Sequence, residues 1–263
     1  MGANINFKDQ MKTSLLITAI QEREYLILSY LLKQSIHVNK RDIGSYSHPL
    51  IKAIGTNNID IVMSYIEKVF SENNKKNIEH TVENIFSITS CDGFPPLILS
   101  YLLNRKEITD VLMNRIMVNT KDYYGYSLMH YAILKRDINT IKILIHHQAD
   151  INNDKYTNYA LDTAIKIQDK EIFSILMNCD DIAVDQPNEF GDTPLLTLIK
   201  NHLLPVEDKK EMLELLLKKE DCDINFIEKE GNTTLIYAII EGHLPIIKLL
   251  IDYGAEINEI YDN

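Results

Sequence analysis

Three oxygen-bearing side chains at alternate positions are the most metal-like feature of the sequence. Asp150, Asn152 and Asp154 occupy the first three ligand spacings of a calcium-binding loop. Such a loop needs glycine at its sixth position, for a sharp turn, and a bidentate glutamate at its twelfth, but the chain has Lys155 and Leu161 there. We therefore reject a calcium site, and the sequence predicts no metal and no other cofactor.

Histidines are the next candidates for metal binding or acid–base catalysis. His146 and His147 are adjacent, so on a helix their rings point in different directions and cannot share a metal ion. The sequence contains no G-x-S-x-G, no phosphate-binding glycine loop and no H-E-x-x-H. We therefore expect the chain not to be an enzyme.

Charge and cysteine usage narrow the class of partner and the compartment. The chain carries 27 basic and 38 acidic side chains, a formal net charge of −11, which opposes attraction to nucleic acid or an anionic membrane. A protein partner with a basic or mixed-charge surface fits better. Cys91, Cys179 and Cys222 form no C-x-x-C pair, which indicates free thiols in a reducing compartment.

No stretch of the sequence predicts a membrane anchor. No apolar run approaches the ~18 to 20 residues of a membrane span, and the first twelve residues are too polar for a signal peptide. We expect a soluble, cytoplasmic protein, or one that reaches a host cytosol if it is an effector.

The amino-acid composition of the chain favours helices. Only 9 glycines and 7 prolines occur in 263 residues, too few for the regular turns of a β-sandwich or barrel. The chain instead repeats itself. Residues 228–238 read EKEGNTTLIYA, residues 242–251 read GHLPIIKLLI and residues 254–258 read GAEIN, and a second copy of this pattern begins at Asp122.

This pattern resembles the ankyrin repeat, with its D-x-x-G-x-T-P-L-H-x-A turn and first helix, its V-V-K-L-L-L second helix and its closing G-A-D-V-N. The resemblance implies an all-α solenoid of about seven stacked helix-turn-helix units, with hairpin turns on one edge, in a single domain over 1–263. The predicted repeats are 9–41, 42–68, 91–121, 122–154, 155–187, 188–227 and 228–260, with insertions at 69–90 and 201–210.

The spacing of apolar residues explains why the units stack. In six of the seven predicted first helices a large residue precedes a small one by three positions, as Leu16 precedes Ala19, so that both lie on one helical face. Leu198 replaces the small residue in the sixth repeat and is expected to push its helices apart. Pro49, Pro96 and Pro194 fall at the first helical turn, where a missing N–H costs little.

The two ends of the chain predict a segment of a longer array. Residues 2–6 match the closing motif of a repeat, and residues 261–263 fall where an eighth repeat would begin. Neither end reads as the polar capping repeat that solenoids usually need. A natural reading frame that ends at Asn263 would contradict this hypothesis.

The resemblance also implies a function, namely non-catalytic protein binding through the turn tips and the concave side of the first helices. His130 matches a histidine that is structural in this family. The predicted partner-binding residues are aromatic: Phe94, Tyr123, Tyr124, Tyr126, Tyr156, Tyr159 and Phe190. Acidic neighbours would attract a basic partner: Asp122, Asp154, Glu189, Asp192, Glu228 and Glu230.

Two alternatives stay open at this stage. The aromatic rings could pack between neighbouring turns instead of meeting a partner. The array could also be the targeting or substrate-recruiting arm of a larger enzyme, channel or host-directed effector, whose active part lies outside the segment.

Overall fold

The computed structural model describes residues 5–8, 13–34, 36, 48–73, 89–115, 118–152 and 160–257. These residues form fourteen α-helices and no strand, which confirms the predicted all-α class. They fall into two compact units, residues 1–128 and 129–263. Three isolated antiparallel bridges, among them Lys121 with Ser127, close the turns that precede first helices.

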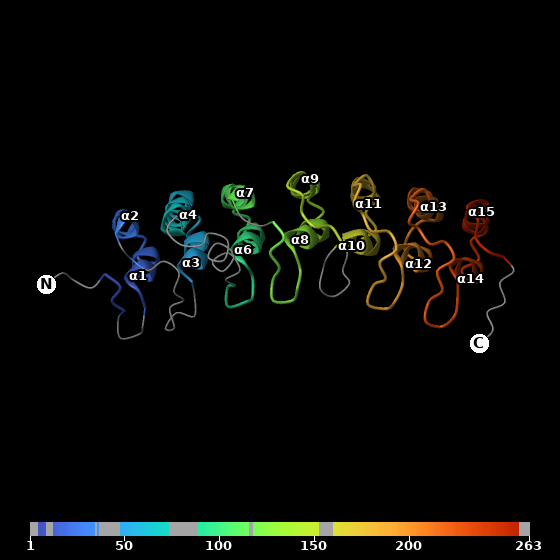
Figure 1. Cartoon of the computed structure of the whole chain (residues 1–263), viewed down its shortest axis with the longest axis horizontal. Helices are drawn as coiled ribbons and strands as arrows, with labels where there is room; N and C mark the ends of the chain where they lie inside the picture. The colour runs from blue at the N-terminus through green and yellow to red at the C-terminus, as the bar shows by residue number, and fades with distance from the viewer. Residues whose placement is uncertain are drawn as a thin grey trace. The chain divides into compact units, whose positions relative to one another are not determined.

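The first unit is two layers of helices (Figure 1). One layer holds the first helices and the other the second helices, and each helix packs on its hairpin partner and on its neighbour in the layer. The first layer is α1 (Leu15–Gln21), α3 (Pro49–Thr56) and α6 (Pro96–Leu102), and the second is α2 (Tyr25–Lys33), α4 (Ile59–Asn73) and α7 (Lys106–Arg115).

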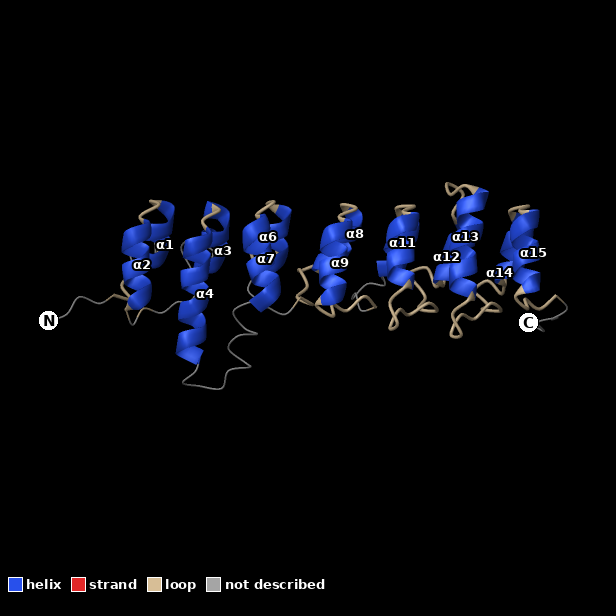
Figure 2. Ribbon diagram, turned by 90° about the horizontal axis from the view of Figure 1, so that it is seen from above, coloured by secondary structure: helices blue, strands red, loops and turns tan. Residues whose placement is uncertain are grey.

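The second unit repeats this two-layer arrangement (Figure 2). Its first helices are α8 (Leu128–Leu134), which begins at the unit boundary, α10 (Ala160–Lys166), α12 (Pro194–Lys200) and α14 (Thr234–Ile240). Its second helices are α9 (Ile138–His146), α11 (Lys170–Met177), α13 (Val206–Leu217) and α15 (Leu244–Asp252).

First helices begin where the repeat pattern predicts, for two local reasons. The hydroxyl of Thr193 accepts a hydrogen bond from the backbone N–H of Leu196 (3.4 Å), and Thr233 does the same for Ile236 (3.3 Å). Each such cap satisfies a backbone donor that the helix leaves open. Proline occupies the first position of α3, α6 and α12, as predicted.

The core lies between the layers and between successive repeats. The large residue of each first-helix pair is buried, from Leu16 in α1 to Leu235 in α14, and each such burial contributes about 1.5 to 3 kcal/mol. The small partner is buried too, as with Ala53 and Ala164. Leu198 is fully buried in α12, and its predicted effect on helix spacing stays a prediction.

The two predicted insertions have different outcomes. The helix α13 already begins at Val206, directly after Pro205, so residues 206–210 are helical and only 201–205 connect α12 to α13. The helix α4 continues to Asn73, so the first residues of the 69–90 insertion extend it. Residues 74–88 of this insertion lie outside the described residues.

Candidate partner-binding surface

The turn that carries Tyr123 and Tyr124 is built around Asp122. The Asp122 carboxylate accepts a hydrogen bond from the backbone N–H of Tyr126 (2.9 Å), and the backbone N–H of Asp122 donates to the Tyr126 carbonyl (3.0 Å). Gly125 completes the turn with a φ of 90°, a conformation that disfavours a side chain. The buried Asp122 therefore fixes the turn from inside, which leaves the two tyrosines at its tip.

Tyr123 and Tyr124 are the most exposed of the described aromatic side chains in this turn. They are 79% and 57% exposed, and their rings meet edge to face with centroids 5.5 Å apart. This contact restricts both rings while leaving their outer surfaces in water. Tyr126 and Phe94 are half-buried, so they support the tip more than they extend it.

A hollow lies beside the tyrosine tip, between the turns at residues 89–93 and 122–125. Its volume is about 600 Å³, and Cys91, Asp92, Tyr123 and Tyr124 are among the residues that line it. The two turns are joined by a hydrogen bond from the Tyr123 N–H to the Gly93 carbonyl (3.0 Å). A Cβ at position 93 would lie 2.6 Å from the Tyr123 Cβ, so only glycine permits this approach.

Phe190 occupies the corresponding tip in the second unit, where it is 67% exposed. Asn188 shapes this turn: its side-chain oxygen accepts from the N–H groups of Phe190 (2.9 Å) and Asp192 (3.1 Å). Its amide nitrogen donates to the buried Asp162 (3.1 Å), which also forms an ion pair with Lys166 (2.8 Å). This tip is thereby tied to the core of the preceding repeat.

The acidic residues of the turns divide into structural and available groups. Asp192 pairs with Lys200 (2.8 Å), and although burial opposes the lysine charge, this carboxylate raises the pKa of Lys200. Burial opposes ionisation of Glu228 as well, but hydrogen bonds from the N–H groups of Glu230 and Asn232 hold its pKa below the ordinary value. Glu189 and Glu230 are exposed, and Glu189 also lies 3.9 Å from the Lys166 ammonium, so several of these carboxylates take part in contacts within the chain.

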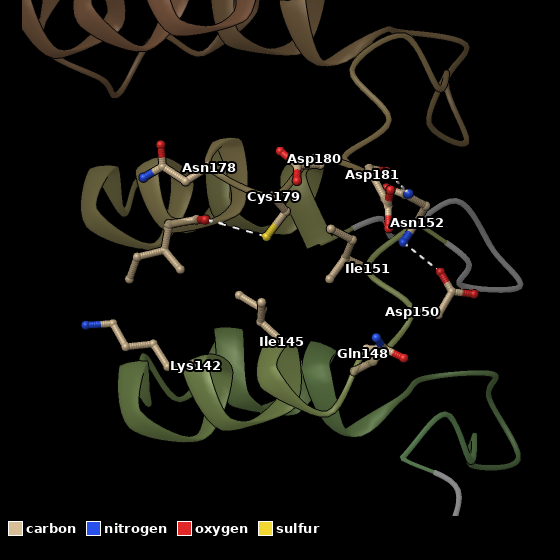
Figure 3. Close-up of a pocket in the computed structure, with 12 residues that line it drawn as sticks. Lys142, Ile145, Gln148, Asp150, Ile151, Asn152, Asn178, Cys179, Asp180 and Asp181 are labelled. Carbon is tan, nitrogen blue, oxygen red and sulfur yellow. Dashed lines mark hydrogen bonds between the residues drawn. The ribbon is translucent and has the colours of Figure 1, made fainter.

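A second hollow, of about 750 Å³, lies between α9 and α11 (Figure 3). Ile175 is among the residues that line it. Ile145 and Ile151 lie toward its middle, while carboxylates such as Asp150 gather toward one end and Lys142 lies at the other. Cys179 faces it, but burial raises the pKa of its thiol, which disfavours the nucleophilic thiolate. This hollow offers contact surface and no activated nucleophile.

The comparisons with known proteins decide the family. The family model for ankyrin repeats in three copies matches residues 50–155 and 161–260, which is most of the chain. The chain belongs to the ankyrin repeat family. This result confirms the resemblance identified from the turn and helix motifs.

The individual relatives have low sequence identity to this chain and are much longer than it. An ankyrin repeat protein of monkeypox virus is 26% identical over 206 residues, 78% of this chain and 31% of its own length. The human transient receptor potential cation channel subfamily A member 1 is 24% identical over 212 residues, 65% of this chain and 19% of its own length. The chain thus spans a third or less of these two relatives.

Solved structures support the same fold. A crystal structure of an ankyrin repeat domain from Acinetobacter baumannii AYE matches with a TM-score of 0.60 and 23% identity. The match covers 79% of this chain and 98% of that domain. Ankyrin repeats are generally protein-binding modules without catalytic groups of their own.

Other predicted ankyrin positions take structural roles. His130 is buried, with its Nδ1 3.5 Å from the hydroxyl of Thr163 in the next repeat. Asp150 accepts the backbone N–H of Asn152 (2.9 Å), and Asn152 in turn accepts the N–H of Ala183 (2.8 Å), so both fix the link between repeats. Among the described residues, no three His, Cys, Asp or Glu side chains are placed to hold a metal ion, and no helix has the length and apolarity to cross a bilayer.

The predicted aromatic set is only partly visible. Tyr156 and Tyr159 lie outside the described residues, and Phe190 belongs to a different unit from Tyr123 and Tyr124. A continuous aromatic ridge therefore stays a prediction. Cys91 and Asp92, which line the hollow beside the tyrosine tip, were not predicted, since no residue pattern marks them.

Proposed function

We propose that the chain is a non-catalytic protein-binding module that holds its partner at the turn tips and along the concave side of the first helices. The observation that carries the proposal is the tyrosine tip: two exposed rings, fixed from below by Asp122, next to a hollow of about 600 Å³. Rigid aromatic side chains give large contact area at a low cost in conformational entropy.

The hollow suggests how the partner would dock. A partner side chain entering it would contact Tyr123 and Tyr124 on one wall and meet the exposed Asp92 on another. A lysine or arginine suits this lining, because its stem can pack on the rings while its charge faces the carboxylate. The net charge of −11 also favours a basic or mixed-charge protein and disfavours nucleic acid.

The absence of catalysis is part of the proposal. Ankyrin repeats are generally non-catalytic, and two of the described residues with catalytic side chains, His130 and Cys179, make contacts inside the chain. With three cysteines free of disulfides, the proposed setting is a reducing intracellular compartment.

The alternative proposal, a recruiting arm of a larger protein, is favoured by one finding. The chain spans 31% of the monkeypox virus protein and 19% of the human channel. If this chain is likewise part of a longer polypeptide, the same tip would recruit a partner to an active part elsewhere. Sequencing of the complete transcript distinguishes the two, since an added catalytic or channel domain would favour the arm.

The proposed site is tested by removing the rings. Y123A/Y124A should weaken partner binding by about 2 kcal/mol or more, roughly 30-fold, because hot-spot aromatics carry most of the affinity. The matched control is L26A/L203A, which removes two strongly exposed apolar side chains elsewhere. Both pairs should leave the helical melting curve nearly unchanged, since exposed side chains contribute little to stability.

Partner capture from a cell extract, followed by titration of the identified partner, supplies the readout. Equal affinity of wild type and Y123A/Y124A would refute the tyrosine tip as the contact. Recovery of nucleic acid in place of protein would refute the proposed partner class.

A further inference from the structure

The hollow between α9 and α11 is a second surface, separate from the tyrosine tip. None of the described residues that line it belongs to a first helix, whereas the proposed function rests on turn tips and first helices. The second helices that follow pack on one another, α11 on α13 and α13 on α15. The volume of the hollow, about 750 Å³, falls within the ~300 to 1,000 Å³ of ligand pockets. It can therefore hold several side chains of a partner.

One end of this hollow is acidic. Asp180 and Asp181 are exposed just past the end of α11, and within the described part of the chain neither forms an ion pair with a lysine or arginine. Asp150 lies toward the same end (Figure 3). The last carbonyls of α9 and α11 add partial negative charge there, because each helix ends on this side. This end of the hollow favours a cation.

The next repeat supplies such a cation from within the chain. Lys219, two residues past the end of α13, donates from its Nζ to the carbonyl of Cys179 in the preceding repeat (3.3 Å). Two residues past the end of α11 stands Cys179 itself, whose thiol donates to the carbonyl of Ile175 in its own helix (3.7 Å). The lysine that reaches back from α13 to α11 therefore has no counterpart at the equivalent position between α11 and α9, where the hollow lies.

We propose that the hollow binds a protein segment that places a lysine or arginine at the acidic end and an aliphatic side chain in the middle. The basic group takes the role that Lys219 has one repeat further on, with carboxylates around it. The aliphatic side chain packs on the isoleucines that line the hollow. Lys142 at the other end gives the two ends opposite charge, which favours one direction for an extended segment.

Short random peptides displayed on phage probe the hollow without a known partner. Phage that bind the immobilised wild type are passed over D180N/D181N, which removes both exposed charges, and the phage that this variant does not retain are sequenced. The enriched peptides should carry lysine or arginine close to leucine, isoleucine or valine.

Matched variants then locate the binding of one enriched peptide, which fluorescence anisotropy measures. D180N/D181N should weaken binding by ~10-fold or more, because the basic group loses its charged acceptors. Its control is E220Q/D221N, which removes two exposed carboxylates at the same distance past the end of α13 and should bind like the wild type.

The isoleucines have a matched pair of their own. I175A shortens the apolar lining and should weaken peptide binding by ~5-fold or more. I143A trims the same, sixth position of α9, which does not line the hollow, and should leave binding unchanged. Each variant should keep the wild-type circular dichroism spectrum, since none of the replaced side chains is fully buried.

The tyrosine tip is tested separately. Y123A/Y124A should bind the enriched peptide like the wild type, so failure of the proposed function and failure of this second site give different results. The second site is wrong if no peptide survives the passage over D180N/D181N, or if the survivors lack basic residues. It is also wrong if E220Q/D221N weakens binding as much as D180N/D181N, or if spermidine displaces the labelled peptide as well as unlabelled peptide does, because the hollow would then select only a small cation.

Discussion

Gly93 connects the fold to the tyrosine tip, and its replacement by alanine has a matched control at Gly231. Both glycines have a φ of 85°, so alanine at either position meets the same backbone cost, about 1 to 2 kcal/mol. They differ in their surroundings. A Cβ at Gly231 meets nothing within 4 Å, whereas a Cβ at Gly93 would lie 2.6 Å from the Tyr123 Cβ.

The added clash sets the expected difference. The Tyr123 Cβ is attached to backbone that also donates a hydrogen bond to the Gly93 carbonyl, so it cannot move away alone. Overpacking of this kind costs about 1 to 3 kcal/mol. G93A should therefore destabilise its repeat by about 2 to 5 kcal/mol in all, against about 1 to 2 kcal/mol for G231A.

Native-state hydrogen exchange measures these costs locally, in the amides of α6 for G93A and of α14 for G231A, the helices that follow each glycine. Because the clash separates the two turns, G93A should also weaken partner binding, while G231A should not. Equal losses of stability in the two variants, or full partner binding by G93A, would refute the reasoning.

Three further predictions concern single side chains. Lys209 is fully buried, and its Nζ donates to the Ile199 carbonyl (2.9 Å). Burial lowers the pKa of Lys209 in the folded chain, so at a pH between the folded and unfolded pKa values the unfolded chain holds more protons than the folded chain. The free energy of unfolding should rise with pH just below the ordinary lysine pKa of ~10.4, and K209M, compared by urea titration, should lack that contribution. Cys91 is exposed, whereas burial raises the pKa of Cys222 to about 12. Iodoacetamide at neutral pH should therefore label Cys91 before Cys222, which peptide mapping measures, and faster labelling of Cys222 would contradict this. T193A removes the cap on the Leu196 N–H and should cost about 1 kcal/mol by thermal melting, whereas T193S should restore most of it.

The sequence predicts most of the fold because ankyrin structure is local. The helix starts at Pro49 and Pro194 follow from residues next to each other in the chain, as do the buried pairs such as Leu16 and Ala19. The repeat template does not predict the start of α13, since it assigns residues 206–210 to an insertion, and these residues are helical in the structure.

The site was predicted less well because it depends on contacts between repeats. Asp122 was expected to face a partner, but it folds into its own turn. Asp162 stands at a position that is aliphatic in most repeats, and only the structure shows its amide partner Asn188, 26 residues away. The hollow beside Tyr123 depends on how closely two turns approach, which no local pattern reports.

Site-specific photo-crosslinking tests the central claim most directly. A benzophenone amino acid replaces Tyr124 in one sample and the strongly exposed Leu203 in another, and the cross-linked species are identified by mass spectrometry. The account predicts one protein attached in high yield at position 124, little at position 203, and loss of the adduct when unlabelled wild-type chain competes. Equal adducts at the two positions, or an adduct that competition does not reduce, would contradict it.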